Sequence, residues 1–150
     1  ASPAPLRILD IDVIRSLINQ NAIVICCGGG GIPVIKKENH YTGVPAVIDK
    51  DRVSSQLAIE MNVDALIIST AIDAIRTGFG TESEEIHKEL SVKQAKIYLD
   101  NGEFPAGSMG PKVASMVDFI ENRIDGKSVL CQPGEAVKAL RGDCGTTISK

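Results

Sequence analysis

The sequence lacks an excess of positive charge, and it lacks any long apolar run. Its 16 Lys and Arg against 19 Asp and Glu give a formal net charge of -3, which leaves no electrostatic footprint for nucleic acid or an anionic membrane surface. The longest apolar stretch, AIVICC, is far short of the roughly 20 residues that span a bilayer. We therefore expect neither nucleic acid nor a membrane as a partner, and any phosphate must be bound by a local site.

The sequence also lacks the spacing of a zinc site or a disulfide framework. Its four cysteines form no CxxC pair and no zinc-like grouping with the two histidines. Cys26 and Cys27 are adjacent, so on a strand they would point to opposite faces. We interpret the cysteines as reduced thiols of a cytoplasmic protein and expect no metal held by protein ligands, although disulfides stay open as an alternative.

Length and composition fit one globular domain. The 150 residues are 43% apolar and 23% charged, which is near average usage, and a chain of this size buries most of its unfolded surface. The opening residues ASPAPLR lack the charged start and the apolar run of a signal peptide. We interpret them as the continuation of a segment that lies upstream.

Short apolar runs alternate with helical periodicity along the chain. Four runs predict buried strands: AIVICC from Ala22, ALIIST from Ala65, SVLC from Ser128 and TTIS from Thr146. Because they are apolar almost throughout, they fit a parallel sheet that is covered on both faces. We predict an α/β fold, a three-layer α/β/α sandwich with a mainly parallel sheet.

Helices are expected between these strands. Apolar residues spaced three and four apart predict helices up to about Asn19, over VSSQLAIEM, and from Val113 to Ile124. Ser91 with Gln94 matches a capping box, and Thr81 with Glu84 matches a weaker one. The stretches IPVIKKENHYTGVPAVID and AIDAIRTGFGTESEE are predicted to be irregular, and each follows a strand end, where parallel sheets place ligands.

Four glycines directly follow the run AIVICC: Gly28, Gly29, Gly30 and Gly31. Without Cβ atoms, their backbone N–H groups can approach a phosphate or carboxylate, and successive amides form an anion-binding nest. Taken alone, a glycine run is more often a flexible turn, and neither GxGxxG nor the Walker pattern GxxxxGK[ST] is present.

Two lysines are expected at helix starts. Lys50 stands between Asp49 and Asp51 at the start of one helix, and Lys112 follows Pro111 at the start of another, within GSMGPKV. A lysine among free amides reinforces the positive end of a helix, which can hold phosphate, and a neighbouring aspartate fixes the ammonium. A solvated, capped first turn and an ordinary surface lysine are the alternatives.

The strings ICCGGGGIPVI, GVPAVIDKD, GEFPAGSMGPKV and CGTTI, in this order, resemble the C-terminal half of the carbamate kinase family. The resemblance covers essentially the whole chain and is closer than that to acetylglutamate, uridylate or aspartate kinases, which share the fold. It implies half of the amino-acid-kinase fold and phosphoryl transfer between carbamoyl phosphate or carbamate and ADP or ATP, with Mg²⁺. It further implies arginine metabolism and a homodimer of the full-length protein.

The resemblance also implies roles for single residues. Lys112 would neutralise the phosphoryl group in flight, Asp51 would organise the catalytic lysines, and Lys50 would contact phosphate. The four glycines would lie beside the phosphoryl group and its acceptor. The nucleotide would be bordered by these residues: Thr70, Ala71, Asp73, Met109, Gly110 and Lys112.

Some positions depart from the family. Arg76, Thr77, Gly78 and Phe79 stand where the family usually has tyrosine or another uncharged residue followed by INF or INY, so the contacts to the base are not carried over. GTTI replaces GTRI near Thr146. Because the family's N-terminal half is not in this sequence, we expect the fragment alone to be inactive. A non-catalytic nucleotide-binding module, a diverged paralogue and a truncation product are the alternatives.

Overall fold

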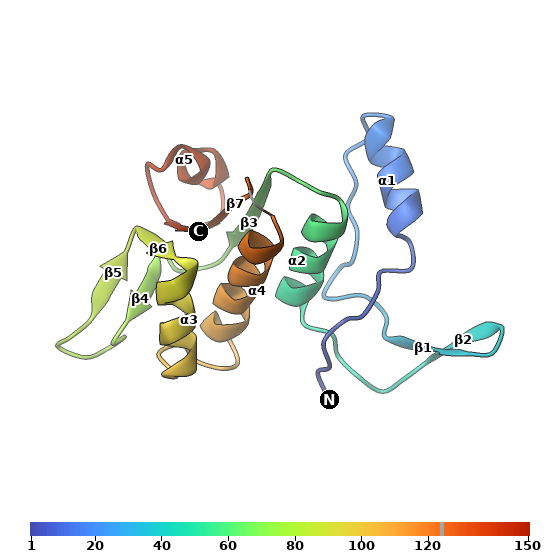
Figure 1. The fold of residues 1–150 in the computed structure, drawn as a ribbon, viewed down its shortest axis with the longest axis horizontal. Coiled ribbons are helices and arrows are strands. Elements are labelled where there is room, and N and C mark those ends of the chain that lie inside the picture. Colours follow the sequence, from blue (N-terminus) through green and yellow to red (C-terminus); the bar gives the residue numbers. More distant parts are fainter. Residues whose placement is uncertain (124) are drawn as a thin grey trace.

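The computed structural model describes residues 1–123 and 125–150, and its centre is a four-stranded sheet with helices packed against it (Figure 1). The sheet has the order β3-β7-β8-β6. The strands are β3 (Ala65–Ser69), β7 (Lys127–Cys131), β8 (Thr146–Ser149) and β6 (Glu89–Ser91). Two of the neighbouring pairs, β3 with β7 and β6 with β8, are parallel, while β7 and β8 are antiparallel. The predicted α/β fold with a mainly parallel sheet is confirmed.

One face of the sheet is covered by three helices, α2 (Lys50–Glu60), α3 (Val92–Asp100) and α4 (Met109–Asn122). The core lies between them and the strands, and α4 supplies more of its fully buried side chains than any other element: Val113, Met116, Phe119 and Ile120. The apolar stripe expected from Val113 onward therefore faces the sheet. Its expected last member, Ile124, lies outside the described residues.

The other face of the sheet is covered by α5 (Ala136–Arg141), whose Ala139 packs on Val129 and Cys131 of β7. This cover is narrow. On β3 the exposed and buried residues alternate, and Ile67 on the open face is 37% exposed. Coverage on both faces is thus correct for β7 and wrong for β3, because the described residues place only a short helix on that side.

The remaining elements flank the sheet. Helix α1 (Ile11–Asn19) occurs where it was expected, and two small antiparallel hairpins are formed by β1 (Val34–Lys37) with β2 (His40–Gly43) and by β4 (Ile75–Thr77) with β5 (Glu85–His87). Figure 1 shows the β1–β2 hairpin extending away from the sheet. The two stretches predicted to be irregular therefore contain these short strands.

The strands that begin at Ala65, Ser128 and Thr146 were correctly predicted to within one residue, but the run from Ala22 to Cys27 forms no strand. Ile23 and Ile25 in this run are 97% and 98% exposed. A strand needs a neighbour to accept and donate its backbone hydrogen bonds, and no strand of the described residues pairs with this run. High β propensity alone could not form it.

Three further predictions concern the first residues of helices. The Ser91–Gln94 capping box is present, with Ser91 N donating to Gln94 Oε1 at 3.0 Å and Gln94 N donating to Ser91 Oγ at 3.2 Å. The box at Thr81 is wrong, because Thr81 Oγ1 donates to Gly78 O and closes a turn instead of starting a helix. Helix α4 starts at Met109, so Pro111 is its third residue, which is harmless because the first four N–H groups have no partner in the helix.

Candidate functional site

The start of α2 is fixed by an aspartate cap. Asp49 has an extended backbone, and its Oδ1 accepts hydrogen bonds from Asp51 N at 3.0 Å and Arg52 N at 3.2 Å. This is the capping expected as the alternative role of the Asp49–Lys50–Asp51 sequence. The cap also fixes the positions of Lys50 and Asp51, because these are the first two residues of the helix.

Lys50 and Lys112 converge on one oxygen of Asp51. Lys112 Nζ donates to Asp51 Oδ2 at 2.8 Å, and Lys50 Nζ lies 3.8 Å from the same oxygen. The side chains of Asp51 and Lys112 are 10% and 13% exposed, whereas that of Lys50 is 58% exposed. The structure thus brings the two lysines together from different helices, and it leaves Lys50 accessible to solvent.

The glycine turn lies against the chain that leads into α2. Gly30 N donates to Cys27 O at 2.9 Å, and Gly30 has φ +136, a conformation open almost only to glycine. A Cβ on Gly30 would lie 2.0 Å from Ile48 O and 3.5 Å from Lys50 N. The close approach of two backbones is therefore the reason for glycine at this position, and it joins the turn to Lys50.

The topology places these groups at one edge of the sheet. Helices α2 and α4 lead through short connections into the parallel strands β3 and β7, so the helix starts and the strand ends lie on the same side (Figure 1). Lys50 and Lys112 stand at the helix starts, where the helix dipole adds partial positive charge. The edge is therefore suited to an anion.

The segment from Thr70 to Asp73 leaves β3 at this edge and is held by the neighbouring strand. Thr70 N donates to Cys131 O at 2.9 Å, and Gln132 Nε2 donates to Ala71 O at 3.0 Å. The backbone of the expected nucleotide floor is thereby attached to the end of β7.

Asp73 continues into a charged network that was not expected. The Arg76 guanidinium forms ion pairs with Asp73 Oδ1 at 2.8 Å and with Glu84 Oε1 at 2.7 Å. The other carboxylate oxygen, Glu84 Oε2, accepts a hydrogen bond from Gly80 N at 2.9 Å. The hydrogen bond from Arg76 lowers the pKa of Asp73, and the bond from Gly80 N, then that from Arg76, lowers the pKa of Glu84. The charge pattern contained a signal for this network, because three charged residues flank a turn of glycines.

Met109 and Gly110 lie where α4 begins. Met109 is buried in the core with its side chain among apolar neighbours, and Gly110 N donates to Pro105 O at 3.0 Å. A Cβ on Gly110 would lie 3.3 Å from that same carbonyl oxygen. Both residues therefore fix the turn that presents Lys112.

The four cysteines have free thiols in the structure. Burial and the neighbouring Cys26 raise the pKa of Cys27 to about 11, and burial also raises the pKa of Cys131 and of Cys144. The raised pKa keeps the thiols of Cys27, Cys131 and Cys144 protonated near neutral pH, which makes them poor nucleophiles.

Within the described residues no group of three His, Cys, Asp or Glu side chains could hold a metal ion. Over the same residues no helix is both long enough and apolar enough to cross a membrane. The chemistry of the edge is thus that of lysines, backbone amides and one buried carboxylate.

Known proteins resemble this chain in sequence and in fold. Residues 1–128 match the profile described as "Amino acid kinase family". The carbamate kinase of Staphylococcus haemolyticus is 41% identical over 149 residues, which is 99% of this chain and 48% of the relative. That of Halobacterium salinarum is 41% identical over 147 residues, 98% of this chain and 48% of the relative.

A solved structure, carbamate kinase from Giardia lamblia bound to AMP-PNP, superimposes with a TM-score of 0.95 at 39% sequence identity. The match covers 99% of this chain and 47% of that one. The chain therefore spans about half the length of the relatives it matches.

Proposed function

Because the chain belongs to the amino acid kinase family, we propose that Lys50, Asp51, Lys112 and the glycine turn form one half of a site for phosphoryl transfer between carbamoyl phosphate and ADP. The observation that carries this proposal is that the ammonium groups of Lys50 and Lys112 meet at one carboxylate oxygen of Asp51, beside the glycine turn. The likeness to carbamate kinases at about 40% identity supports the choice of substrates.

In this reaction the bond between the carbamate oxygen and phosphorus breaks while a terminal phosphate oxygen of ADP bonds to the same phosphorus, giving carbamate and ATP. The transition state is loose, with negative charge spread over the three equatorial oxygens of the phosphoryl group. The protein contributes position and electrostatic stabilisation, so no nucleophilic side chain is required. This is consistent with a site made of two lysines, one carboxylate and a glycine turn.

The two lysines differ in how they act. Asp51 holds Lys112 at 2.8 Å in a nearly buried position, which fixes the ammonium where charge develops. Lys50 Nζ lies farther from the same oxygen, at 3.8 Å, and the Lys50 side chain is more than half exposed. Its ammonium can therefore move with a bound phosphate. Asp51 is thus a positioning residue, and the two lysines stabilise the transferred group.

On this proposal the nucleotide lies over Thr70, Ala71 and Asp73, near Met109 and Gly110, and the AMP-PNP complex of the Giardia relative supports nucleotide binding. Mg²⁺ would accompany the nucleotide and neutralise phosphate charge. It prefers phosphate oxygens and a few carboxylates as ligands. Asp51 already serves the lysines.

The test is the Lys112→Ala variant of the full-length protein that carries this chain. We expect ATP formation from carbamoyl phosphate and ADP to fall by orders of magnitude, with a much smaller change in ADP affinity, because Lys112 acts on the transferred group. Lys93→Ala removes an exposed lysine of α3 and is the matched control. Near-normal turnover of Lys112→Ala would show that the assignment is wrong.

A second candidate is a nucleotide-binding module without catalysis. It is favoured by Arg76, whose two ion pairs occupy the nucleotide side where related kinases usually have an uncharged residue. Calorimetry of the full-length protein with ADP and ATP separates the two functions: nucleotide binding without ATP formation from carbamoyl phosphate identifies the module.

The resemblance to carbamate kinases also leads us to propose a cytoplasmic homodimer that serves arginine metabolism. Sedimentation of the full-length protein tests the dimer. Growth of the source organism on arginine, with and without the gene, tests the pathway.

A further inference from the structure

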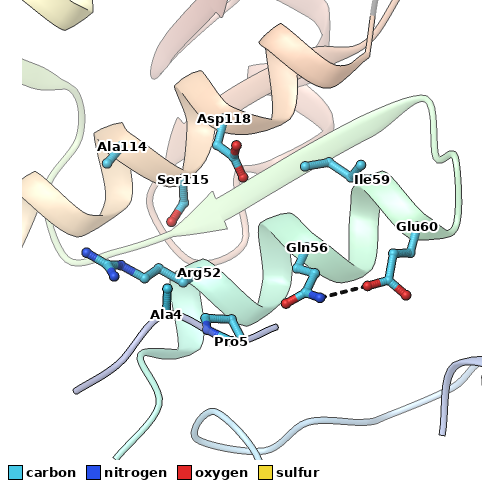
Figure 2. A pocket seen from close by; sticks show the side chains of 9 residues that line it. All are labelled: Ala4, Pro5, Arg52, Gln56, Ile59, Glu60, Ala114, Ser115 and Asp118. Atoms are coloured by element: carbon cyan, nitrogen blue, oxygen red, sulfur yellow. Dashed lines mark hydrogen bonds between the residues drawn. The ribbon is translucent and has the colours of Figure 1, made fainter. Parts of the chain in front are cut away.

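A groove of about 480 Å³ lies between α2 and α4, where the N-terminal segment crosses them at Ala4 and Pro5. Figure 2 shows Arg52 and Gln56 of α2 on one side of the groove, with Ser115 and Asp118 of α4 on the other. Its volume lies in the range of roughly 300–1,000 Å³ that is typical of small-molecule sites. None of the lining residues belongs to the site of Lys50, Asp51 and Lys112.

Two polar atoms of the groove residues are buried without a hydrogen-bond partner in the described part of the chain, Ser115 Oγ and Gln56 Oε1. Ser115 is only 3% exposed. The Gln56 amide is held in one orientation, because its Nε2 donates to Glu60 Oε1 at 2.8 Å and leaves the oxygen free. Buried polar groups nearly always have partners, so these two atoms indicate one that the described residues do not supply.

The groove also carries charges of both signs. The guanidinium of Arg52 lies at one end, as Figure 2 shows, and no carboxylate of the described residues is within ion-pair distance of it. Asp118 presents its carboxylate from the opposite helix, where Oδ2 accepts a hydrogen bond from Ser55 Oγ at 3.2 Å. Gln56 follows Arg52 by one helical turn, about 6 Å along the axis.

From this arrangement we propose that the groove binds a small amino-carboxylate, a molecule with one ammonium and one carboxylate on a short aliphatic chain. The carboxylate pairs with Arg52 and accepts a hydrogen bond from Ser115 Oγ. The ammonium donates to Gln56 Oε1 and to Asp118. The aliphatic chain lies against Ile59, so each end of the ligand meets the group of opposite chemistry.

The probes are glycine, β-alanine, 4-aminobutyrate and 6-aminohexanoate, titrated into the isotope-labelled full-length protein that carries this chain and followed by the amide chemical shifts of α2 and α4. Because Arg52, which meets the carboxylate, and Gln56, whose Oε1 meets the ammonium, are one helical turn apart, affinity should peak at 4-aminobutyrate. Butyrate and butylamine each lack one charge and should bind at least about tenfold more weakly. This comparison needs no variant, so it does not depend on the folding of a mutant.

Two variants locate the site. Arg52→Met and Ser115→Ala should each weaken binding of 4-aminobutyrate by about tenfold. Lys93→Met, on the exposed face of α3, should leave it unchanged, and melting curves show whether each variant is folded. If no probe shifts resonances of α2 and α4, or if Arg52→Met binds as the unmodified chain does, the groove holds water only and the proposal is wrong.

Discussion

Ser55 Oγ donates a 3.2 Å hydrogen bond to Asp118 Oδ2 and thereby joins α2 to α4, one turn beyond the contact of Asp51 with Lys112. Ser55 is almost fully buried. The two helices that carry the proposed catalytic pair are thus held together at two successive levels, and each level can be tested separately.

Ser55→Ala should lower the free energy of unfolding by about 1 kcal/mol, because Asp118 loses a donor that water replaces only in part. Urea unfolding of the chain measures this change. Ser54→Ala is the matched control, since Ser54 Oγ donates only to Lys50 O of its own helix and its loss should be nearly neutral. A double-mutant cycle with Asp118→Ala should show a coupling energy of at least about 0.5 kcal/mol, and additive effects would contradict the bond.

Asp51→Asn should lower the free energy of unfolding by about 2 kcal/mol, because the nearly buried ammonium of Lys112 loses its counter-charge. The same urea experiment measures it. Asp12→Asn breaks the exposed pair with Arg15 and should cost less than about 0.5 kcal/mol. Equal costs for the two variants would mean that burial of the Asp51 pair has no energetic weight.

Gly30→Ala should disrupt the glycine turn, because the added Cβ would lie 2.0 Å from Ile48 O at a φ that alanine rarely adopts. We expect a loss of about 2–3 kcal/mol, or local melting of the turn that appears as faster amide exchange around Lys50. Gly29→Ala is the control within the same turn, since no atom lies within 4 Å of its added Cβ. An unchanged Gly30→Ala variant would contradict the close backbone approach.

Thr146→Val should lower the free energy of unfolding by about 2 kcal/mol, because it removes two buried hydrogen bonds. The fully buried Thr146 Oγ1 accepts a hydrogen bond from Ile75 N at 2.8 Å and donates one to His87 O at 2.5 Å. Valine has nearly the same shape, so the loss reports on the hydrogen bonds. Thr147→Val, at the next position of β8 and partly exposed, should change stability by less than about 0.5 kcal/mol. Thermal unfolding of both variants provides the comparison.

The network of Asp73, Arg76 and Glu84 should make stability depend on acid pH. Both carboxyl groups have folded pKa values below their ordinary values of 3.8 and 4.5, so their contribution is present above about pH 4.5 and is lost as pH falls through the folded values. In Arg76→Gln, the free energy of unfolding should fall less steeply as the pH drops below about 4.5. Its pH dependence near neutral pH should change little. Urea midpoints at a series of pH values measure it, and an identical acid limb in Arg76→Gln would exclude the network as its source.

Most of the helical fold could be predicted from the sequence, because helix signals are local. The capping box at Ser91 and the apolar stripe from Val113 depend on residues a few positions apart, and both are present. The run from Ala22 failed as a strand since its formation depends on a pairing partner, which the apolar pattern does not specify. The short strand β6 was missed for the converse reason, because it exists through pairing with β8, far along the chain.

The candidate site shows the same division. Position at a helix start could be read locally for Lys50 and Lys112, and the structure places both there. That the two ammonium groups share one oxygen of Asp51 depends on how α2 packs on α4, because Asp51 and Lys112 are 61 positions apart in the sequence. Arg76 appeared only as a departure from the family, and its partners Asp73 and Glu84 became visible once the turn between them was formed.

The position of Thr146 has a consequence for the order in which the molecule assembles. Its hydroxyl is bonded to Ile75 and His87, which precede it by 71 and 59 residues, so the β4–β5 hairpin gains these bonds only after β8 has docked. Contacts of such long sequence separation form late, because their loop-closure entropy must be overcome first. During refolding we expect the amides of this hairpin to become protected after those of α2 and α4, which makes completion of the proposed nucleotide side a late event.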